Sequence, residues 1–367
     1  MRGGERQLLY LAAALSRLGH RNIVACRANS PLEEQARRLD LETLELPFLM
    51  EFDPLSALRL CAAARRCDRP LIHAHTAHAA GLAALASAAN GAPRVLHRRV
   101  DFSLNGNLSR RFKYGPAKRL VAVSGAIRDL LVQEGLDSRK IEVVTDGIPV
   151  DEEECAWVGL KKDYFSSPTT EERTALRRDI AAQFNIPTQG SWIGNLAALV
   201  PHKDHDNLIT AALLVLMKKP DAIFLIGGEG PEGPRLLEQI KRMDLAGKVL
   251  LLGHIQDPVS LLKSLDIFAL SSWGEGMGSV LLEAAACGIP IAATTAGGIP
   301  EIVSDGRSGL LAPPRNPETL AANILKLMDD AALARRLREQ ALKQLSQFGL
   351  RRMAKRMEGI YERVYSE

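Results

Sequence analysis

The sequence contains little that could cross-link a fold or hold a structural metal. Its five cysteines are odd in number and no two are spaced as Cys-x-x-Cys, so we expect neither disulfides nor a cysteine-based zinc site. His73, His75 and His78 resemble a metal cluster by residue type. No acidic or cysteine residue accompanies them, and His73 and His75 fall within a strand-to-loop run, so the sequence predicts no metal site there.

Long hydrophobic runs and aromatic residues are also scarce. No apolar run reaches the roughly 18 residues that are needed to span a bilayer, and the first five residues do not resemble a signal peptide. We therefore expect a cytoplasmic protein. Aromatic residues make up only 5% of the chain and no recognised nucleic-acid-binding motif occurs, which argues against nucleic acid as a partner.

The composition that remains is typical of a globular protein with two domains. Of the 367 residues, 46% are hydrophobic and 25% are charged, and the chain is too long for one ordinary core. Short apolar runs alternate with amphipathic helical patterns, which predicts an α/β fold with two doubly wound parallel sheets. We expect a first domain at 1–165, joined by a C-terminal helix at 350–367, and a second domain at 188–349.

The predicted strands are short apolar runs in both halves of the chain. In the first domain they cover 22–26, 71–74, 94–97, 120–123 and 141–144. In the second domain they cover 192–196, 222–226, 249–252, 267–270, 291–294 and 309–312. Because such sheets bind ligands at the carboxyl ends of their strands, the cleft between the two sheets is the expected site.

Positive charge is concentrated in the first domain. Residues 1–150 hold 22 Lys and Arg against 15 Asp and Glu, a net charge of +7, which leaves −3 of the total +4 for the remainder. Five basic residues surround Phe112 and Tyr114: Arg110, Arg111, Lys113, Lys118 and Arg119. Such a cluster is typical of a contact with acidic lipid head groups or a phosphorylated acceptor, although each charge alone also fits a solvated surface.

Residues 275–283 combine two acids with glycines at the start of an apolar helical pattern. Gly276 and Gly278 let the backbone approach a ligand closely, and the first turn of a helix favours an anion. The segment is therefore suited to a phosphorylated sugar. Taken alone, Glu275 also fits a solvated loop acid, and Glu283 an acid that stabilises a helix N-terminus.

The segment 228–233 reads Gly-Glu-Gly-Pro-Glu-Gly and matches the G-x-G-x-x-G pattern of dinucleotide-binding folds. Such folds need an acid at the end of the next strand, where this chain has Gly253 and His254. Pro231 also removes an N–H group from the loop. We therefore expect no dinucleotide site, and the absence of Gly-Lys-Ser/Thr excludes a P-loop.

An ordered set of short motifs resembles a known family. The second half carries Gly194-Asn-Leu with Lys203, Gly228-Glu-Gly-Pro231, Glu275-x7-Glu283 and Gly297-Gly-Ile-Pro-Glu301. The first half adds His73-Ala-His75, His97-Arg-Arg99, Val123-Ser124 and Asp146-Gly147. In this order they resemble the retaining glycosyltransferases of family 4, which have the GT-B fold, and in particular the bacterial type that builds lipopolysaccharide and cell-envelope glycans.

The resemblance implies a set of site residues. Glu275, His97 and Lys203 are expected to be catalytic: Glu275 and His97 contact the transferred sugar, and Lys203 neutralises the departing diphosphate. Glu283 is expected to bind the ribose. The donor-binding set that the resemblance implies is Gly4, Gly194, Asn195, Lys203, Gly276, Met277, Gly278, Ser279 and Glu283.

Two departures from the family pattern stand out. The family usually has Arg where this chain has Asn195, so one cation on the phosphates is missing, and Arg98 or Arg99 is a candidate to replace it. A first strand normally leads into the glycine loop that Gly3 and Gly4 match here, whereas this sequence begins at the loop. That strand is normally central and buried, so we expect that adding one upstream would stabilise the first domain.

The resemblance implies transfer of a sugar with retention from a nucleotide-diphosphate sugar to a hydroxyl of a glycan or glycolipid acceptor, without cofactor or metal. The acceptor hydroxyl attacks from the face on which the diphosphate leaves. Peripheral contact with an anionic membrane surface is expected at the inner face of the cytoplasmic membrane. Two alternatives stay open, a GT-B sugar-nucleotide epimerase and a catalytically weak protein that only binds nucleotide-sugars.

Overall fold

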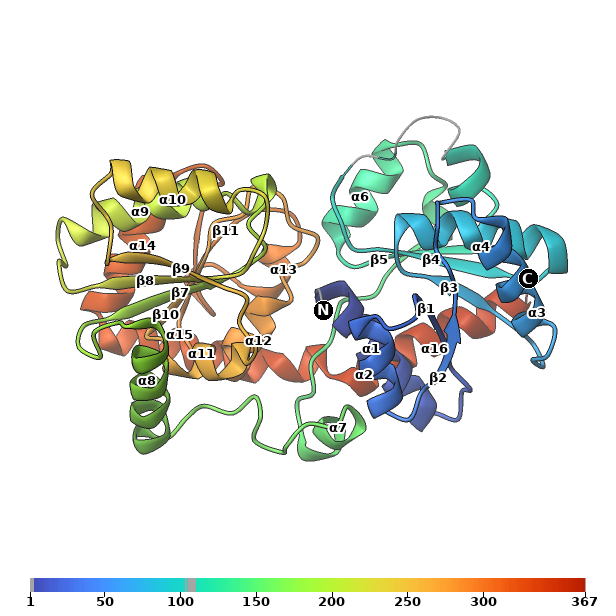
Figure 1. Ribbon diagram of the computed structural model, residues 1–367, viewed down its shortest axis with the longest axis horizontal. Helices are drawn as coiled ribbons and strands as arrows, with labels where there is room; N and C mark the ends of the chain where they lie inside the picture. Colours follow the sequence, from blue (N-terminus) through green and yellow to red (C-terminus); the bar gives the residue numbers. More distant parts are fainter. Residues whose placement is uncertain (1–2, 103, 105–109, 367) are drawn as a thin grey trace. The chain divides into compact units, whose positions relative to one another are not determined.

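The structure, a computed structural model, describes residues 3–102, 104 and 110–366 (Figure 1). The chain divides into two compact units. The first unit comprises Met1–Lys162 and Gln347–Glu367, and the second comprises Asp163–Ser346. The second unit therefore includes α8 (Thr170–Phe184), which lies in the segment that the sequence assigned to neither domain.

The strands of the first unit are all paired in parallel but form two sheets. One sheet joins β1 (Ile23–Cys26) to β2 (Glu42–Glu45). The other has the order β3-β4-β5-β6, with the bounds Ile72–Ala74, Arg94–Arg98, Arg119–Ala122 and Ile141–Val143. Among the described residues no strand links β1 to β3, so the single first sheet that the sequence predicted is divided in two.

Helices cover these sheets and complete the core of the first unit. They are α1 (Gly3–Arg17), α2 (Pro31–Arg38), α3 (Pro54–Ala64), α4 (Ala77–Asn90), α6 (Gly125–Gln133), α7 (Glu152–Trp157) and α16 (Leu350–Ser366), with short turns η1 (Arg110–Tyr114) and η2 (Ser138–Lys140). Apolar residues of α1 and α16 pack with Val95 of β4 and Val121 of β5 in one buried cluster. The C-terminal helix thus belongs to the core of the first unit.

The second unit is built on one six-stranded sheet of the order β12-β11-β10-β7-β8-β9. Its strands are β7 (Trp192–Leu196), β8 (Ile223–Gly227), β9 (Val249–Gly253), β10 (Ile267–Leu270), β11 (Ile291–Thr294) and β12 (Leu310–Ala312). All pairs are parallel. Reversal of the strand order on either side of β7 is the signature of a doubly wound sheet, as predicted.

Helices lie on both faces of this sheet, with α9 and α10 on one side and α11 and α12 on the other (Figure 1). Besides α8, they are α9 (His205–Leu216), α10 (Gly233–Arg242), α11 (Pro258–Ser264), α12 (Val280–Ala286), α13 (Ile299–Ile302), α14 (Pro317–Asp329) and α15 (Ala331–Gln344), with η3 (Pro201–Lys203) and η4 (Leu345–Phe348). Pro at the first turn of α10, α11 and α14 suits these starts because the first helical N–H groups need no intrahelical partner. Two α/β units with parallel sheets confirm the predicted fold class.

The structure bears on two expectations from the composition, one about membrane-spanning helices and one about the cysteines. Within the described ranges, no helix is both long and apolar enough to cross a membrane. All five cysteines are free thiols: Cys26, Cys61, Cys67, Cys155 and Cys287. Four of them are buried, where burial raises the pKa of the Cys26 thiol to about 11 and of the Cys287 thiol to about 12, which keeps both protonated and unreactive.

Candidate functional site

Lys203 and Glu275, which the sequence placed in different motifs, form an ion pair in the second unit. Their strands β7 and β10 are hydrogen-bonded neighbours, so the loops that follow both strands meet at one edge of the sheet. The Nζ atom of Lys203 lies 2.5 Å from Oε2 of Glu275, and the hydroxyl of Ser272 donates to the same oxygen at 3.1 Å. Both side chains are largely buried, with 18% and 11% of their surface exposed.

Hydrogen bonds between the two loops hold this pair in place. The hydroxyl of Ser271 donates to the carbonyl of Lys203 at 2.9 Å. Trp273 donates its backbone N–H to the carbonyl of His202 at 3.0 Å and its indole N–H to that of Pro201, also at 3.0 Å. The cation and the carboxylate are therefore positioned by the backbone rather than by their mutual attraction alone, as a preorganised electrostatic site requires.

The glycines around Glu275 permit a close approach of the chain to itself. Gly297 has a φ of +50°, and a Cβ atom there would lie 1.7 Å from the carbonyl oxygen of Glu275. Gly278 has a φ of +82° in the turn that leads to α12. Gly276 and Met277 are buried in the same loop, and Ser279 precedes the helix. The loop therefore folds as the sequence predicted, with a tight path that other residues would strain.

Glu283 lies in the first turn of α12 and only 1% of its surface is exposed. It stands eight positions after Glu275, and the two acids emerge from the loop and from the helix, respectively. Burial of a carboxylate is costly unless it is paired or hydrogen-bonded, so a position of this kind suits a group that makes polar contacts. The structure leaves the assignment of Glu283 to the ribose as a prediction.

Asn195 and Gly194 serve the packing of β7. The amide of Asn195 is buried, donates to the carbonyl of Ala269 at 2.8 Å and lies 3.2 Å from Nε2 of His205. A Cβ atom on Gly194 would lie 2.1 Å from the side chain of Leu265. In this structure Asn195 thus links β7 to β10 and to α9, and its polar atoms are satisfied within the protein. Its predicted donor contact gains no support.

The glycines of segment 228–233 are explained by close packing of the backbone and not by a dinucleotide site. A Cβ atom on Gly228 would lie 2.0 Å from the carbonyl oxygen of Ala197, and one on Gly230 would lie 2.2 Å from that of Leu199. Leu199 in turn donates its N–H to the carbonyl of Glu229 at 3.0 Å. The pattern therefore lets two loops of the protein run against each other.

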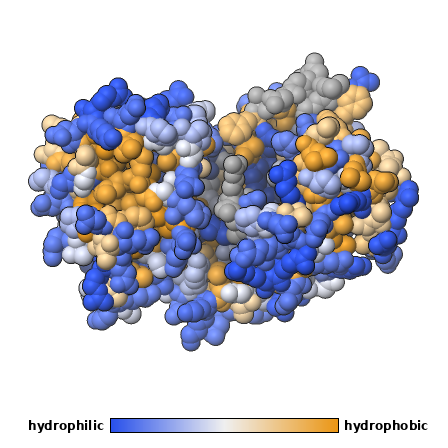
Figure 2. All heavy atoms as spheres, in the orientation of Figure 1, coloured by the Kyte–Doolittle hydropathy of each residue, from blue (hydrophilic) through white to orange (hydrophobic). Residues whose placement is uncertain are grey.

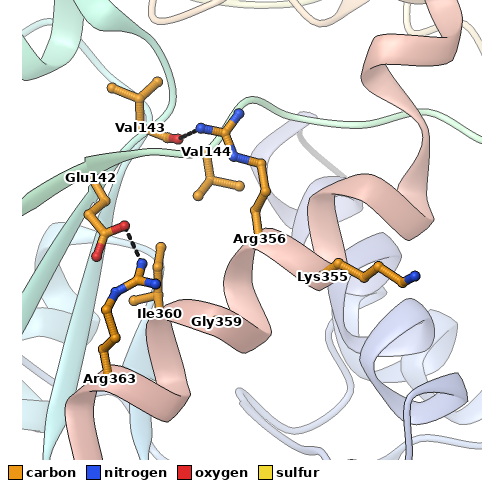
Figure 3. A pocket seen from close by; sticks show the side chains of 8 residues that line it. All are labelled: Glu142, Val143, Val144, Lys355, Arg356, Gly359, Ile360 and Arg363. Atoms are coloured by element: carbon orange, nitrogen blue, oxygen red, sulfur yellow. Dashed lines mark hydrogen bonds and ion pairs between the residues drawn. The ribbon is translucent and has the colours of Figure 1, made fainter. Parts of the chain in front are cut away.

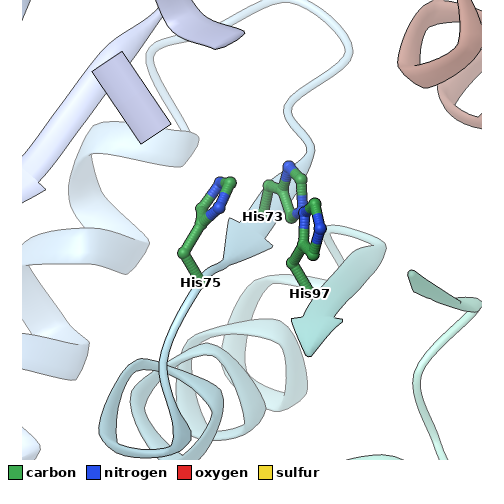
Figure 4. A group of neighbouring side chains, drawn as sticks. All are labelled: His73, His75 and His97. Atoms are coloured by element: carbon green, nitrogen blue, oxygen red, sulfur yellow. The ribbon is translucent and has the colours of Figure 1, made fainter. Parts of the chain in front are cut away.

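His97, the third predicted catalytic residue, lies in the first unit beside two other imidazoles (Figure 4). The ring centroids of His73 and His75 are each 5.5 Å from that of His97 and 4.0 Å from one another. Burial lowers the pKa of His73 to about 3. Burial, and then nearby positive charge, holds the pKa of His75 and of His97 well below the usual range. All three are neutral at pH 7.

Arg99 connects this cluster to two other predicted motifs. Its Nε donates to Asp146 at 2.9 Å and its Nη1 donates to Nδ1 of His75 at 2.8 Å. Because arginine only donates, a neutral His75 carries its proton on Nε2. The side chain of Arg99 also passes Gly4, where a Cβ atom would lie 3.9 Å from its Cδ. The two hydrogen bonds join motifs that lie 24 and 47 residues apart in the chain.

Arg98 is used within its own unit. Its Nε donates to the carbonyl of Val100 at 3.0 Å, and further bonds reach the carbonyl of Phe102 and the hydroxyl of Tyr114. Arg98 and Arg99 both form hydrogen bonds within the protein. Neither is therefore free to replace the arginine that the family usually has at the position of Asn195.

The basic cluster expected at 110–119 does not form one charged surface. Lys113 is buried and paired with Glu51, and Arg119 is buried beside Glu142 at 3.6 Å. Of the five basic residues of this cluster, Arg111 and Lys118 have exposed side chains. The side chain of Arg110 lies outside the part of the chain that the structure describes. This prediction was wrong because sequence proximity to aromatic residues does not reveal which lysines and arginines turn inward to meet an acid.

A separate pocket lies between β6 and α16 (Figure 3). Arg363 forms an ion pair with Glu142 at 2.5 Å, and Arg356 donates to the carbonyl of Val143 at 2.7 Å. Lys355, Gly359, Ile360 and Val144 complete its lining. Both arginines have partners within the protein, so Lys355 is the one cation among the described lining residues that has none. A single free lysine is not enough to bind a diphosphate.

Sequence reasoning missed two long-range contacts of the first unit. The hydroxyl of Tyr361, on α16, lies 2.7 Å from Nδ1 of His73 although 288 residues separate them. Gln7 exchanges hydrogen bonds of 2.8 and 3.0 Å with the backbone of Gly147. Gln7 lies in α1 and Gly147 follows β6, so both contacts join segments far apart in the chain, and neither had a signal in the sequence.

Comparison with known proteins identifies families for both halves of the chain. The family model described as Glycosyltransferase Family 4 matches residues 1–152, and the one described as Glycosyl transferases group 1 matches residues 177–344. Among solved structures, that of Anabaena Alr3699/HepE in complex with UDP-glucose is similar, with a TM-score of 0.84, 21% identity and coverage of 99% of this chain and 96% of the other. This likeness supports the fold.

Curated relatives match over shorter stretches. The N-acetyl-alpha-D-glucosaminyl L-malate synthase of Bacillus anthracis is 33% identical over 154 residues, which are 42% of this chain and 40% of that protein. The GDP-mannose-dependent monoacylated alpha-(1-6)-phosphatidylinositol monomannoside mannosyltransferase of Corynebacterium glutamicum is 33% identical over 183 residues, which are 47% and 46%. The chain thus spans under half the length of these two relatives.

Proposed function

The chain belongs to family 4 of the glycosyltransferases and has the GT-B fold, and from this premise we propose that it transfers a sugar from a nucleotide-diphosphate sugar to a hydroxyl of a glycan or glycolipid. The observation that carries the proposal is the Lys203–Glu275 pair, held by backbone bonds at the carboxyl edge of the second sheet. It combines a cation for a departing diphosphate with an acceptor for sugar hydroxyls.

We propose that the reaction retains the anomeric configuration. The acceptor oxygen forms a bond to the anomeric carbon on the face from which the diphosphate leaves, and the bond from that carbon to the diphosphate oxygen breaks. The departing oxygen takes the proton of the acceptor. Negative charge grows on the diphosphate during this step, so a positive group that is already in position lowers the barrier. We assign that group as Lys203.

Glu275 then exchanges its partner when the donor binds. In the structure its carboxylate accepts from Lys203 and Ser272. A diphosphate attracts the ammonium of Lys203 more strongly than one carboxylate does, which frees an oxygen of Glu275 for the hydroxyls of the transferred sugar. We further assign His97, a neutral imidazole, to a contact with that sugar, and Glu283 to the ribose.

The identity of the donor can be tested by stability. A ligand that binds only the folded chain raises the melting temperature by mass action. The similar structure of Anabaena Alr3699/HepE contains UDP-glucose, and one relative is named as GDP-mannose-dependent. We therefore choose UDP-, GDP- and ADP-sugars as the ligands for this melting screen. The nucleotide released with and without a glycolipid acceptor then tests the reaction. Release that depends on the acceptor supports transfer, acceptor-independent conversion supports the epimerase, and no turnover supports a binding protein.

We propose that an anionic membrane surface is the place where the acceptor is met, at the cytoplasmic face, in the synthesis of lipopolysaccharide or another cell-envelope glycan. The outer side of α3 carries exposed residues at helical spacing, and two arginines follow it: Leu55, Leu58, Arg59 and Ala62, then Arg65 and Arg66. The preceding loop exposes Leu49, Met50 and Phe52. Figure 2 shows hydrophobic residues interspersed with hydrophilic ones on this part of the first unit. Apolar and basic residues on one face are typical of helices that lie in a membrane interface.

Replacement of Leu55 and Leu58 by glutamate is expected to abolish binding to vesicles of anionic phospholipid. Both side chains are exposed, 47% and 65%, so the change removes interfacial apolar surface without disturbing the core. Co-sedimentation with vesicles measures the effect. The matched control is Leu237→Glu, at an exposed leucine of α10 in the second unit, which should bind as the unaltered chain does. Equal binding by both variants would assign the membrane contact to another surface.

Transfer is expected to need no divalent metal. Lys203 supplies the positive charge that a metal ion gives in metal-dependent transferases, and the family resemblance implies the same. Prior treatment with a chelator should leave the rate of nucleotide release undiminished. Loss of activity that is restored by magnesium or manganese would contradict the assignment of Lys203.

A further inference from the structure

Three imidazoles of the first unit converge at the ends of two neighbouring strands. His73 lies in β3, His75 follows that strand directly, and His97 lies in β4. The two strands run in parallel, with His73 opposite Val95, so their carboxyl ends meet. One nitrogen of each imidazole lies within 4.8 Å of a nitrogen of the other two. Figure 4 shows the three rings grouped at this edge of the sheet.

Several nitrogens of this cluster are buried without a hydrogen-bond partner among the described residues. They are Nε2 of His73 and both Nδ1 and Nε2 of His97. A buried polar atom without a partner costs about 1–3 kcal/mol, and native proteins keep few of them. Three such atoms in two adjacent side chains indicate that a bound group completes the site.

The surroundings match those of histidines that bind a metal. Such a histidine uses one ring nitrogen for the ion and holds the other in a hydrogen bond that fixes the ring. In His73, Nδ1 is bonded to the hydroxyl of Tyr361 at 2.7 Å, which leaves Nε2 for an ion. His73 and His75 are half-buried as whole residues, while Nε2 of His73 is itself buried.

We propose that His73, His75 and His97 bind a transition-metal ion of the zinc class. Three imidazoles with an open fourth position are a coordination set that suits Zn²⁺. With Zn–N bonds of about 2.0–2.1 Å, tetrahedral ligand atoms lie about 3.3–3.5 Å apart. The nitrogens lie within 4.8 Å of one another here, so each separation needs to shrink by at most about 1.5 Å. From the sequence alone, His73 and His75 were grouped with His78, which is exposed on α4, and no metal was expected because no acidic or cysteine residue accompanies them. His97 was not combined with them.

Arg99 controls how readily the site forms. It donates to Nδ1 of His75, which keeps the proton on the other nitrogen, and it brings a positive charge close to the ion. Asp146 offsets that charge through its ion pair with Arg99 at 2.9 Å. Binding of a metal by His75 therefore requires that Arg99 give up its bond to this histidine. Arg99→Gln should consequently bind the metal more tightly than the unaltered chain.

The functional consequence rests on the proposed function. If His97 contacts the transferred sugar, an ion bound to His97 withdraws that contact and blocks the reaction. Zinc is then a reversible inhibitor and not a cofactor, and this agrees with transfer that needs no metal. A chelator restores the activity that zinc removes.

Metal binding is tested directly on the full chain after removal of metals, by titration with Co²⁺ and Zn²⁺. Bound Co²⁺ is followed by its visible absorption and Zn²⁺ by calorimetry. We expect one ion per chain, and Tyr361→Phe should lower the affinity by about 10–100-fold, as loss of an outer partner does. His97→Gln should lower it at least as much. The matched control, His78→Ala, should bind as the unaltered chain does, and the five cysteines stay present in every variant.

Two results would overturn the site. One is the same stoichiometry and affinity in His97→Gln as in the unaltered chain. The other is weaker binding in Arg99→Gln, which is informative even if the histidine variants fail to fold. The inhibitory role is tested apart from the site, by nucleotide release with and without zinc. Zinc that binds but does not slow transfer would refute the role of His97, whereas a chain without any transfer activity leaves the binding result intact.

Discussion

Lys203→Ala is expected to lower the kcat of sugar transfer by about 10²–10³-fold, the usual effect of removing one preorganised group that stabilises developing charge. The ammonium of Lys203 lies 2.5 Å from Glu275 in a largely buried pair, so water cannot replace it efficiently. The loss should appear mainly in kcat, because negative charge on the diphosphate grows between the bound donor and the transition state. Nucleotide release at saturating donor measures it.

Two further variants separate chemistry from structure. Lys203→Arg keeps the charge and should recover part of the rate. Lys219→Ala is the matched control, because Lys219 forms an exposed ion pair with Asp329 at 2.6 Å in the same unit and should leave kcat unchanged. Circular dichroism and melting establish that each variant is folded. A Lys203→Ala chain that is folded and within about threefold of the original kcat would remove Lys203 from the chemistry.

The strands were predictable where burial demands apolar residues. All four residues of β10 and all four of β11 are buried, and both strands are apolar except for Thr294 at the end of β11. β2 escaped prediction because Glu42 and Glu45, at its two ends, are exposed and pair with Arg21 and Arg37 on the surface. A strand at the edge of a two-stranded sheet buries too little for its pattern to stand out.

The contents of the site were predictable to the extent that neighbouring strands end together. Lys203 and Glu275 follow β7 and β10, and adjacency of these strands is enough to bring them into contact. What could not be predicted is which polar groups the protein itself satisfies. Asn195 was expected in the donor-binding set because of its place in a motif, and in the structure its amide is bonded to Ala269 and His205. Only the three-dimensional partners decide between these two roles.

For the histidine cluster, the sequence predicts part of the group but not the residue that orients it. Parallel pairing of β3 and β4 predicts that His73 and His97 lie near one another, so this part of the cluster was within reach of the sequence. Tyr361 comes from a helix 288 residues later, and its bond to His73 depends on how α16 packs on the first unit. The sequence therefore identifies the imidazoles but not the partner that orients them.

Glu283→Ala is expected to weaken the binding of the nucleoside diphosphate alone, whatever sugar the donor carries. A hydrogen bond to a charged group contributes about 1.5–3 kcal/mol, which corresponds to roughly ten- to more than a hundredfold in Kd. Because Glu283 is buried, with 1% of its surface exposed, Glu283→Gln serves as a second variant that keeps the volume. Calorimetry with the diphosphate of the base found in the stability screen measures both.

Glu275→Ala should behave differently although both acids belong to one motif. It leaves the ribose contact intact and releases Lys203 from its ion pair, so affinity for the nucleoside diphosphate should be unchanged or slightly higher. Turnover should fall and discrimination between sugars on the same nucleotide should relax, because the hydroxyl contacts of the transferred sugar are lost. If folded Glu275→Ala and Glu283→Ala chains lose diphosphate affinity to the same degree, the two acids act as one unit and the division between sugar and ribose is incorrect.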